Sequence, residues 1–373
     1  MKIFKLQIGR NASGKLHMRV IHNKDSEQCE LPDLPKWMCD VQEGNLDWFH
    51  WGRNAFDAVF GSKDSSLRSF WEGKVRERIE HFDPFLLQVE NTVWGDYLPF
   101  TVHWEAMVGT TLPCQDTSTT YYPLGRFPSP VDVIRTPKLP LERDECHQPF
   151  NTKSLLDKWK VAIIHVPSIT PVSMEVNFLR KYLDYLKQKS QNFDLVGVFE
   201  FNGHNGREIS ERLRLQNVTL VDIIAHAADE NHPNMLAVNN QSYPWEALLA
   251  HLSTIRSVQI ILLACCFSDH FIDKNVPPAV FLCKNGVPAI IAWNPRPYDT
   301  TLPHFHRAFY RAMAEGNHIV RAVSTGRSTI FNSIDLRIPR HWIRAFAPRL
   351  YLHCDAQIEK LSFPLPSSLL KGI

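Results

Sequence analysis

The sequence predicts an α/β protein in which a mostly parallel sheet carries helices on both faces. Two observations favour this architecture. After residue 158, short runs of Val, Ile and Leu alternate with amphipathic stretches of helical periodicity. These runs are apolar at nearly every position, which is typical of strands covered on both faces. A third pattern, two alternating runs around a turn at the N-terminus, predicts a β-hairpin and a helical region ahead of the sheet.

Residues 1–110 are predicted to hold the hairpin and the helices. KIFKLQI and KLHMRVI alternate on either side of RNASG, two helical stretches lie within 45–82, and DPFLLQVE has the pattern of a strand. Residues 111–157 are rich in Pro, Thr and Ser and are predicted to be a connection, in which VDVIRT is a candidate edge strand.

Residues 158–373 are predicted to form the core domain. Its expected strands are WKVAIIHV, FDLVGVFEF, VTLVDIIAHA, VQIILLACC and GVPAIIAW. Its expected helices are VSMEVNFLRKYLDYLKQKS, GREISERLRL, WEALLAHLSTI, PPAVFLCKNG and TLPHFHRAFYRAMAEG. Because strands and helices alternate along the chain, a parallel sheet is expected.

Composition excludes several classes of protein. The chain of 373 residues is 44% hydrophobic and 21% charged, with a net charge of +2 and no cluster of Lys and Arg, so nucleic-acid binding is not expected. No run approaches a membrane span and the N-terminus alternates, so a cytoplasmic protein without membrane contact is predicted. The eight cysteines show no C-x-x-C spacing, which favours reduced thiols over disulfides or zinc.

Two of the predicted strands end in residues that can do chemistry. The last residue but one of VTLVDIIAHA is His226, and the last residue but one of VQIILLACC is Cys265. Ligands bind at the carboxyl ends of strands in open α/β sheets, and a right-handed crossover makes these strands neighbours. A thiol beside an imidazole can act as a nucleophile with a general base. Packing of Cys265 and capping of the sheet by His226 are the structural alternatives.

Other residues also have both a structural and a functional interpretation. Cys266 follows Cys265 and is either a buried side chain or the nucleophile itself. A zinc site made of these two cysteines and His270 lacks a fourth ligand, so no metal is expected. Asp299 is either the N-cap of the following helix or a pocket residue that selects Lys or Arg, whereas Arg296 would select an acidic side chain.

The stretch from 221 to 327 resembles the CHAT domain, a family of caspase-like cysteine peptidases. The resemblance is carried by DIIAHA, by IILLACC and, most specifically, by GVPAIIAWNPRPYDTTLPHFHRAFYRAMAEGNHIVRAVSTGR. VHWEAM at 102–107 is similar to the family's Pro-Trp-Glu segment, with His103 where proline is usual. The resemblance implies a caspase-like fold over most of the chain.

The same resemblance implies a mechanism. Cys265 would be the nucleophile, His226 the general acid and base, and the backbone N–H groups of Ala227 and Cys265 the oxyanion hole. The implied activity is that of a cysteine endopeptidase that needs no cofactor, cuts an extended peptide of a protein substrate and acts in bacterial defence or programmed death. Since no TPR array is visible, a sensor or TPR-type protein would activate it in trans.

Departures from the family pattern favour an alternative. Ala227 replaces the usual glycine after the histidine, and Cys266, Phe267 and Ser268 replace the usual residues after the cysteine. If the motif is aligned on Asp222, Asp229 falls at the place of the catalytic histidine. The alternative function is therefore a catalytically inactive caspase-like scaffold.

Overall fold

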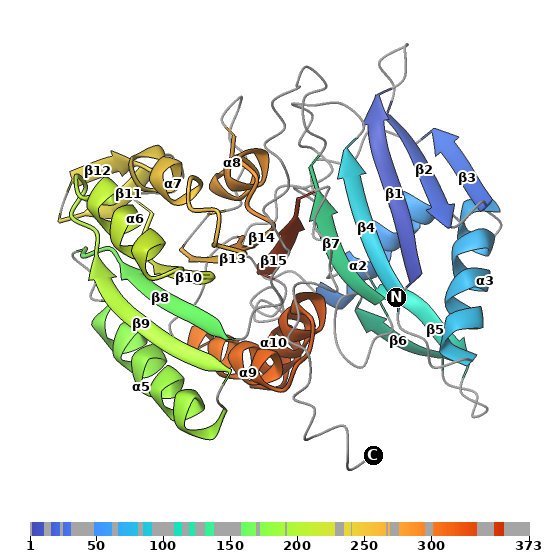
Figure 1. Ribbon diagram of the computed structural model, residues 1–373. Coiled ribbons are helices and arrows are strands. Elements are labelled where there is room, and N and C mark those ends of the chain that lie inside the picture. Colours follow the sequence, from blue (N-terminus) through green and yellow to red (C-terminus); the bar gives the residue numbers. More distant parts are fainter. Residues whose placement is uncertain are drawn as a thin grey trace. The chain divides into compact units, whose positions relative to one another are not determined.

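A computed structural model of the protein describes the helices, the strands and their immediate connections. The described residues are 2–10, 16–22, 25–30, 48–61, 66–80, 85–91, 108–113, 119–123, 131–137, 158–168, 172–190, 192–227, 235–239, 241–265, 268, 276–294, 301–333 and 347–353. They form two compact units (Figure 1). The first consists of Met1–Leu139 and Phe331–Phe346, and the second of Pro140–Ile330 and Ala347–Ile373.

The second unit is built on a mostly parallel sheet. Its strands are β8 (Trp159–His165), β9 (Phe193–Glu200), β10 (Leu220–Ile224), β13 (Ile260–Ala264), β14 (Ala289–Trp293) and β15 (Pro348–Leu352). They lie in the order β15-β14-β13-β10-β8-β9, and all neighbours are parallel except β14 and β15. The predicted fold class is thus confirmed.

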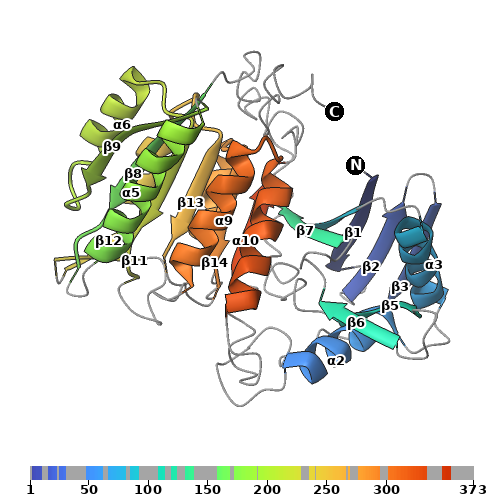
Figure 2. The ribbon, with the colours of Figure 1, turned by 90° about the horizontal axis from the view of Figure 1, so that it is seen from below.

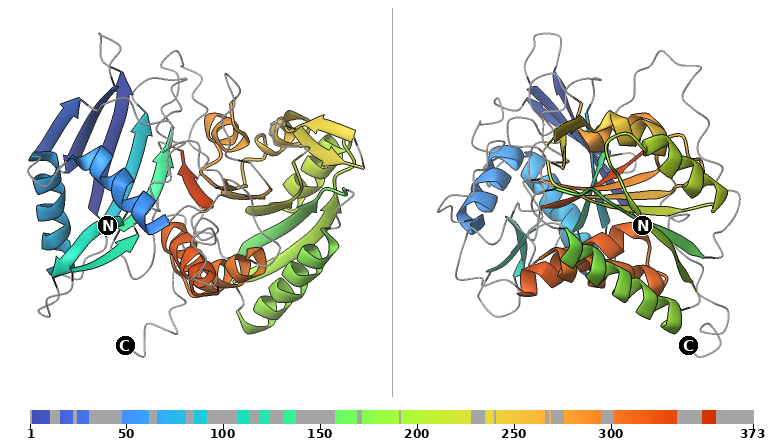
Figure 3. Two further views of the ribbon diagram at one scale, coloured as in Figure 1. Left: turned by 180° about the vertical axis from the view of Figure 1, so that it is seen from behind. Right: turned by 90° about the vertical axis from the view of Figure 1, so that its left-hand side faces the viewer.

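Helices cover both faces of this sheet. They are α5 (Ser173–Lys189), α6 (Gly206–Leu215), α7 (Glu246–Leu252), α8 (Pro278–Lys284), α9 (Leu302–Ala314) and α10 (Ile319–Ser333). Figure 2 shows α5, α9 and α10 side by side on one face, and the right-hand view of Figure 3 shows α7 and α8 on the other. No helix among the described residues is long and apolar enough to cross a membrane.

The apolar runs of the sequence become the middle of this sheet. Every residue of β10, β13 and β14 is buried, because helices lie above and below them. α5 buries one stripe, at Val176, Leu179, Leu183 and Leu186, while its polar residues face outward.

Three elements of the second unit lie outside the sequence prediction. β15 adds an antiparallel strand beside β14, and the hairpin of β11 (Met235–Val238) and β12 (Gln241–Pro244) follows β10. The third element, α10, includes Gly326, at which an added Cβ would lie 2.6 Å from the ring of Phe305 on α9. The next residue, Arg327, donates from Nε to the carbonyl oxygen of Pro348 at 2.8 Å and so ties α10 to β15.

The first unit also combines a sheet with helices, as predicted. Its strands are β1 (Lys2–Arg10), β2 (Leu16–His22), β3 (Asp25–Glu30), β4 (Phe85–Asn91) and β7 (Val131–Thr136), with a separate hairpin of β5 (Val108–Pro113) and β6 (Thr119–Pro123). Its helices are α2 (Trp48–Phe60) and α3 (Ser66–Glu80). The N-terminal hairpin is confirmed as the antiparallel pair β1–β2, and VDVIRT is β7, which pairs in parallel with β4.

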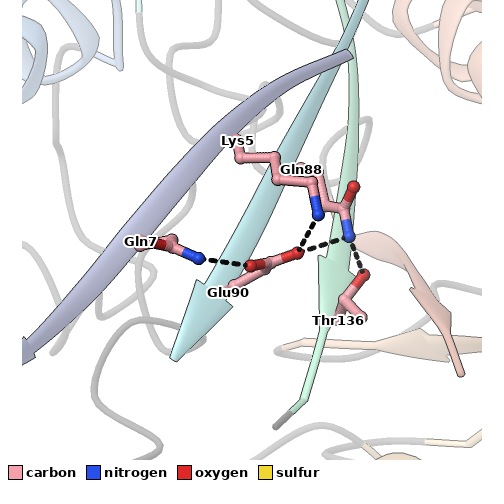
Figure 4. Close-up of polar contacts among 5 residues, drawn as sticks. All are labelled: Lys5, Gln7, Gln88, Glu90 and Thr136. Atoms are coloured by element: carbon pink, nitrogen blue, oxygen red, sulfur yellow. Dashed lines mark hydrogen bonds and ion pairs between the residues drawn. The ribbon is translucent and has the colours of Figure 1, made fainter. Parts of the chain in front are cut away.

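A cluster of polar side chains joins β1, β4 and β7 (Figure 4). The carboxylate of Glu90 accepts hydrogen bonds from Lys5 at 3.2 Å, Gln7 at 3.0 Å and Gln88 at 2.7 Å, and Gln88 also donates to the hydroxyl of Thr136 at 3.2 Å. Because successive strand residues face opposite sides, the opposite face of these strands is apolar and buried. Its buried side chains include Leu6, Ile8, Leu87, Val89 and Val133. Glu90 thus links β4 to β1, and Gln88 links β4 to β7.

Two glycine-to-alanine substitutions test the packing of α10. Gly326→Ala would place a methyl group against the buried ring of Phe305, and overpacking of this kind costs about 1–3 kcal/mol of unfolding free energy. The matched substitution Gly73→Ala lies in α3, where nothing is within 4 Å of the added carbon, so it should gain about 0.5–1 kcal/mol from helix propensity. Denaturant unfolding of both variants measures the difference. Equal stabilities would contradict the described packing of α9 against α10.

Candidate active site

The predicted adjacency of the two strands that end in His226 and Cys265 is confirmed. β10 and β13 are parallel neighbours, with Ile224 paired to Ala264. The backbone N–H of Ala225 still donates to the carbonyl of Ala264 at 3.3 Å, so the chains remain together one residue further. Cys265 and His226 consequently leave the sheet at the same edge.

This edge lies next to the point where the strand order reverses. The chain passes from β8 outward to β9 and then returns to β10 on the other side of β8. Ligands of open α/β sheets bind outside the carboxyl ends of the strands at such a point. The position in the sheet is therefore that of a binding site.

Cys265 begins a turn directly after β13. Its backbone N–H donates to the carbonyl of Leu263 at 2.8 Å, which closes a three-residue γ-turn centred on Ala264. The side chain of Cys265 is fully buried, with 0% of its surface exposed. The γ-turn ends the regular alternation of side chains along β13. The alternation along the strand therefore does not determine the face of the sheet on which the Cys265 side chain lies.

His226 leads into the hairpin of β11 and β12. The carbonyl of His226 accepts a hydrogen bond from the N–H of Ala237 at 3.0 Å, and Ala227 forms an antiparallel bridge with Leu236. His226 itself is partly exposed. In an antiparallel bridge of this type, the hydrogen bonds are made by the backbone groups of the residues before and after the bridged pair. The N–H of Ala227 is therefore not used in the hydrogen bonds of the bridge.

The remaining predicted site residues lie outside the described residues. These are Cys266, His270, Arg296 and Asp299. The N-cap position of α9 is occupied by Thr301, two residues after Asp299, and Pro stands in the first turn of the helix. Within the described ranges, no three His, Cys, Asp or Glu side chains are placed to hold a metal ion.

A buried polar cluster anchors the strand that carries His226. Asp222, in the middle of β10, is fully buried and accepts a hydrogen bond on Oδ2 from the hydroxyl of Tyr310 at 2.8 Å. Nε2 of His306 lies 3.2 Å from the same oxygen, close enough for an ion pair although the angle is not that of a hydrogen bond. Tyr310 and His306 are four residues apart on α9, so both reach the sheet from one helix face.

Burial governs how the three groups of this cluster titrate. It raises the pKa of Asp222, while His306 and the Tyr310 hydroxyl lower it. Burial lowers the pKa of His306, and the negative charges of Asp222 and Glu175 oppose this effect by raising it. Burial, reinforced by Asp222, holds the pKa of Tyr310 well above its ordinary value, so Tyr310 remains a hydrogen-bond donor at neutral pH.

Sequence reasoning did not assign a role to this cluster. His306 is buried against Asp222. The available signal was a single carboxylate inside an apolar strand, because a buried carboxylate requires donors. Another histidine, His165, ends β8 at the same edge as His226, and its Nε2 lies 3.9 Å from Oε2 of Glu200.

Comparisons with known proteins give structural likenesses only. No family model matches the sequence. No curated protein matches it either. Among solved structures, the chain is similar to Porphyromonas gingivalis RgpB, in a complex of its pro- and mature domains, with a TM-score of 0.48 and 11% identity over 82% of this chain and 72% of that one.

Two further structures are also similar. Caspase-1 from Spodoptera frugiperda has a TM-score of 0.36 and 9% identity over 58% of this chain and 95% of that one. A chain of the Saccharomyces cerevisiae separase-securin complex has a TM-score of 0.46 and 12% identity over 94% of this chain but 30% of its own length. Because these TM-scores are all below 0.5, the fold assignment rests on the strand order and helix layers described above.

The anchoring of β10 can be tested by removing single hydroxyl groups. Tyr310→Phe leaves the buried Asp222 without its 2.8 Å donor, and a hydrogen bond to a charged group contributes about 1.5–3 kcal/mol. Tyr182→Phe is the matched control, because the Tyr182 hydroxyl donates to the Arg307 carbonyl near the surface of α5 and its loss should cost less than about 1 kcal/mol. Thermal or denaturant unfolding measures both. A smaller loss for Tyr310→Phe than for the control would contradict the anchoring role.

Proposed function

We propose that this protein is a caspase-like cysteine endopeptidase of the CHAT type. The observation that carries the proposal is the in-register parallel pairing of β10 with β13, after which His226 and Cys265 leave the sheet at one edge. A thiol and an imidazole at the same edge supply a nucleophile and a general base. The resemblance of DIIAHA and IILLACC to the CHAT family supports the same assignment.

The proposed reaction proceeds through an acyl-enzyme. His226 takes the proton of the Cys265 thiol, the sulfur attacks the peptide carbonyl carbon, and the carbonyl electrons move onto oxygen. His226 then protonates the leaving amine as the C–N bond breaks. A water molecule, deprotonated by His226, attacks the thioester, which releases the new carboxylate and returns the proton to sulfur.

Two backbone N–H groups are proposed to stabilise the oxyanion, those of Ala227 and Cys265. The N–H of Ala227 lies outside the bridge that this residue forms with Leu236. The N–H of Cys265 donates to Leu263, so it must leave that carbonyl before it can bind an oxyanion. The proposal therefore includes a rearrangement of the turn after β13 on activation.

The proposed substrate is an extended segment of a protein. Asp299 would favour a basic side chain before the cut and Arg296 an acidic one, since each recognises the opposite charge. A regulatory protein in trans, of a sensor or TPR type, is proposed to start the reaction in a bacterial defence or programmed-death system. Uncovering the buried Cys265 is a task that such a partner could perform. The proposed reaction needs no cofactor.

A second candidate function is a catalytically inactive scaffold. The complete burial of Cys265 favours it, because a nucleophile has to reach a carbonyl carbon. In this reading the sheet binds a protein partner and the cysteine is a small packed side chain. The two functions differ in the chemistry of one thiol.

Alkylation separates the two functions. If Cys265 and His226 form a dyad, an iodoacetamide probe should modify Cys265 well below pH 8.5, the ordinary thiol pKa being about 8.5, in protein co-expressed with the products of neighbouring genes that would uncover the buried thiol. The rate at pH 7 should fall about tenfold or more in His226→Ala, because each unit of thiol pKa changes the thiolate fraction tenfold. Mass spectrometry of the labelled peptides gives the rate for each cysteine.

The matched control is His304→Ala, which removes an exposed histidine of α9 and should label like the wild type. Equal rates in wild type and His226→Ala would rule out the dyad and support the scaffold. Modification of Cys266 in place of Cys265 would identify Cys266 as the nucleophile.

Peptidase activity is tested in cells that express this chain together with the products of neighbouring genes. We expect new protein N-termini in the wild type that are absent in Cys265→Ala and at least about a hundredfold rarer in His226→Ala, in line with the loss of a general base. Quantitative N-terminal proteomics provides the count and the cut site. Termini that persist unchanged in Cys265→Ala would assign the cleavage to another protease.

A further inference from the structure

Ser268 is a fully buried hydroxyl residue three positions after Cys265. Its exposed fraction is 0%. Its hydroxyl donates to the carbonyl of Leu263 at 3.1 Å and accepts the backbone N–H of Trp293 at 2.9 Å. Its own carbonyl accepts the N–H of Ala279 in α8 at 3.4 Å. Both capacities of the hydroxyl are therefore used, and each leads to the end of a different strand.

The two partners of this hydroxyl would otherwise bond to each other. The N–H of Ala289 donates to the carbonyl of Gln259 at the start of the β13–β14 ladder. Bonds of a parallel ladder recur every two residues, so the N–H of Trp293 belongs opposite the carbonyl of Leu263. The paired residues end at Leu262 with Ile291, and the Ser268 hydroxyl lies between the next donor and acceptor.

The inserted hydroxyl separates β13 from β14 where Cys265 leaves the sheet. On its other side, β13 stays paired with β10 as far as Ile224 with Ala264. The carbonyl of Leu263 accepts from both the N–H of Cys265 and the hydroxyl of Ser268, so one oxygen fixes the two ends of the turn. Cys265 and Ser268 are therefore both held to the carbonyl oxygen near the carboxyl end of β13, the strand that lies beside β10.

We propose that Ser268 is the positioning residue of the turn that holds Cys265 beside β10, acting by occupying one rung of the β13–β14 ladder. This inference rests on the proposed peptidase function. It adds that the geometry of the thiol depends on a hydroxyl whose own bonds run to Leu263 and Trp293. Without the hydroxyl, Trp293 can bond directly to Leu263, the two strands close, and Cys265 loses one of the bonds that fix its turn.

The test compares the pH dependence of thiol labelling in three variants and the wild type, each co-expressed with the products of neighbouring genes that would uncover Cys265. Ser268→Ala should slow alkylation of the reactive cysteine at pH 7 by about tenfold, which corresponds to a rise of about one unit in the thiol pKa. Ser268→Thr keeps the hydroxyl and should recover to within about threefold of the wild type. Ser210→Ala is the matched control, because Ser210 is also buried but bonds locally to the Arg207 carbonyl on α6. It should leave the pH profile unchanged.

The outcomes separate this inference from the function on which it rests. A wild-type thiol that is reactive at low pH, together with an unchanged profile in Ser268→Ala, would overturn the positioning role and leave the peptidase proposal intact. A wild type in which neither Cys265 nor Cys266 reacts faster than in the unfolded chain would overturn both. A purely structural role would lower the unfolding temperature of Ser268→Ala without changing the profile of the folded protein.

Hydrogen exchange on the wild type provides a measurement that does not depend on the folding of a variant. If Ser268 occupies a rung of the ladder, the amide of Trp293 should exchange as slowly as those of Ile290 and Ile291 in β14. The amide of Cys265 should also be protected by Leu263. Exchange of the Trp293 amide at the rate of an open loop would contradict the inference.

Discussion

The parallel pairing of β10 with β13 is the constraint on which the proposed site depends. Parallel strands bring their carboxyl ends to one edge, and neighbouring strands lie about 4.8 Å apart. Because Ile224 and Ala264 are opposite each other, a histidine two residues later and a cysteine one residue later start from adjacent positions. One intervening strand would double the separation and leave the two residues without a shared proton.

Two buried polar residues of the second unit bond to elements beside this pair of strands. Asp222 ties β10 to α9, and Ser268 joins the ends of β13 and β14. Burying a polar group is unfavourable unless its hydrogen bonds are made, so each one permits few arrangements of its neighbours. Apolar packing brings the strands together. The hydrogen bonds of Asp222 and Ser268 fix the position of β10 and the path of the chain after β13. Activation that uncovers Cys265 would have to act on the turn between Leu263 and Ser268.

Much of the second unit could be predicted because its strands are apolar throughout and its helices are amphipathic. α10 escaped prediction because its residues, which include several Ser, Thr and Val together with Gly326, have low helix propensity. Its packing is what stabilises it: Gly326 permits close approach to Phe305, and Arg327 binds the carbonyl of Pro348. β15 could not be predicted from its five residues alone, since a short apolar run takes its place only by pairing with β14.

The sequence by itself determined most of the alternating strands and helices of the second unit, the parallel sheet and the two strand ends at which a thiol and an imidazole occur. These features depend on the spacing of apolar residues within each short segment, and this spacing can be seen in the sequence alone. Only the tertiary structure decided that Asp222, His306 and Tyr310 meet, that Cys265 is buried, and that Ser268 enters the ladder between β13 and β14. The reason is that a hydrogen bond between distant residues depends on the placement of two or three elements at once, and no local pattern encodes that placement.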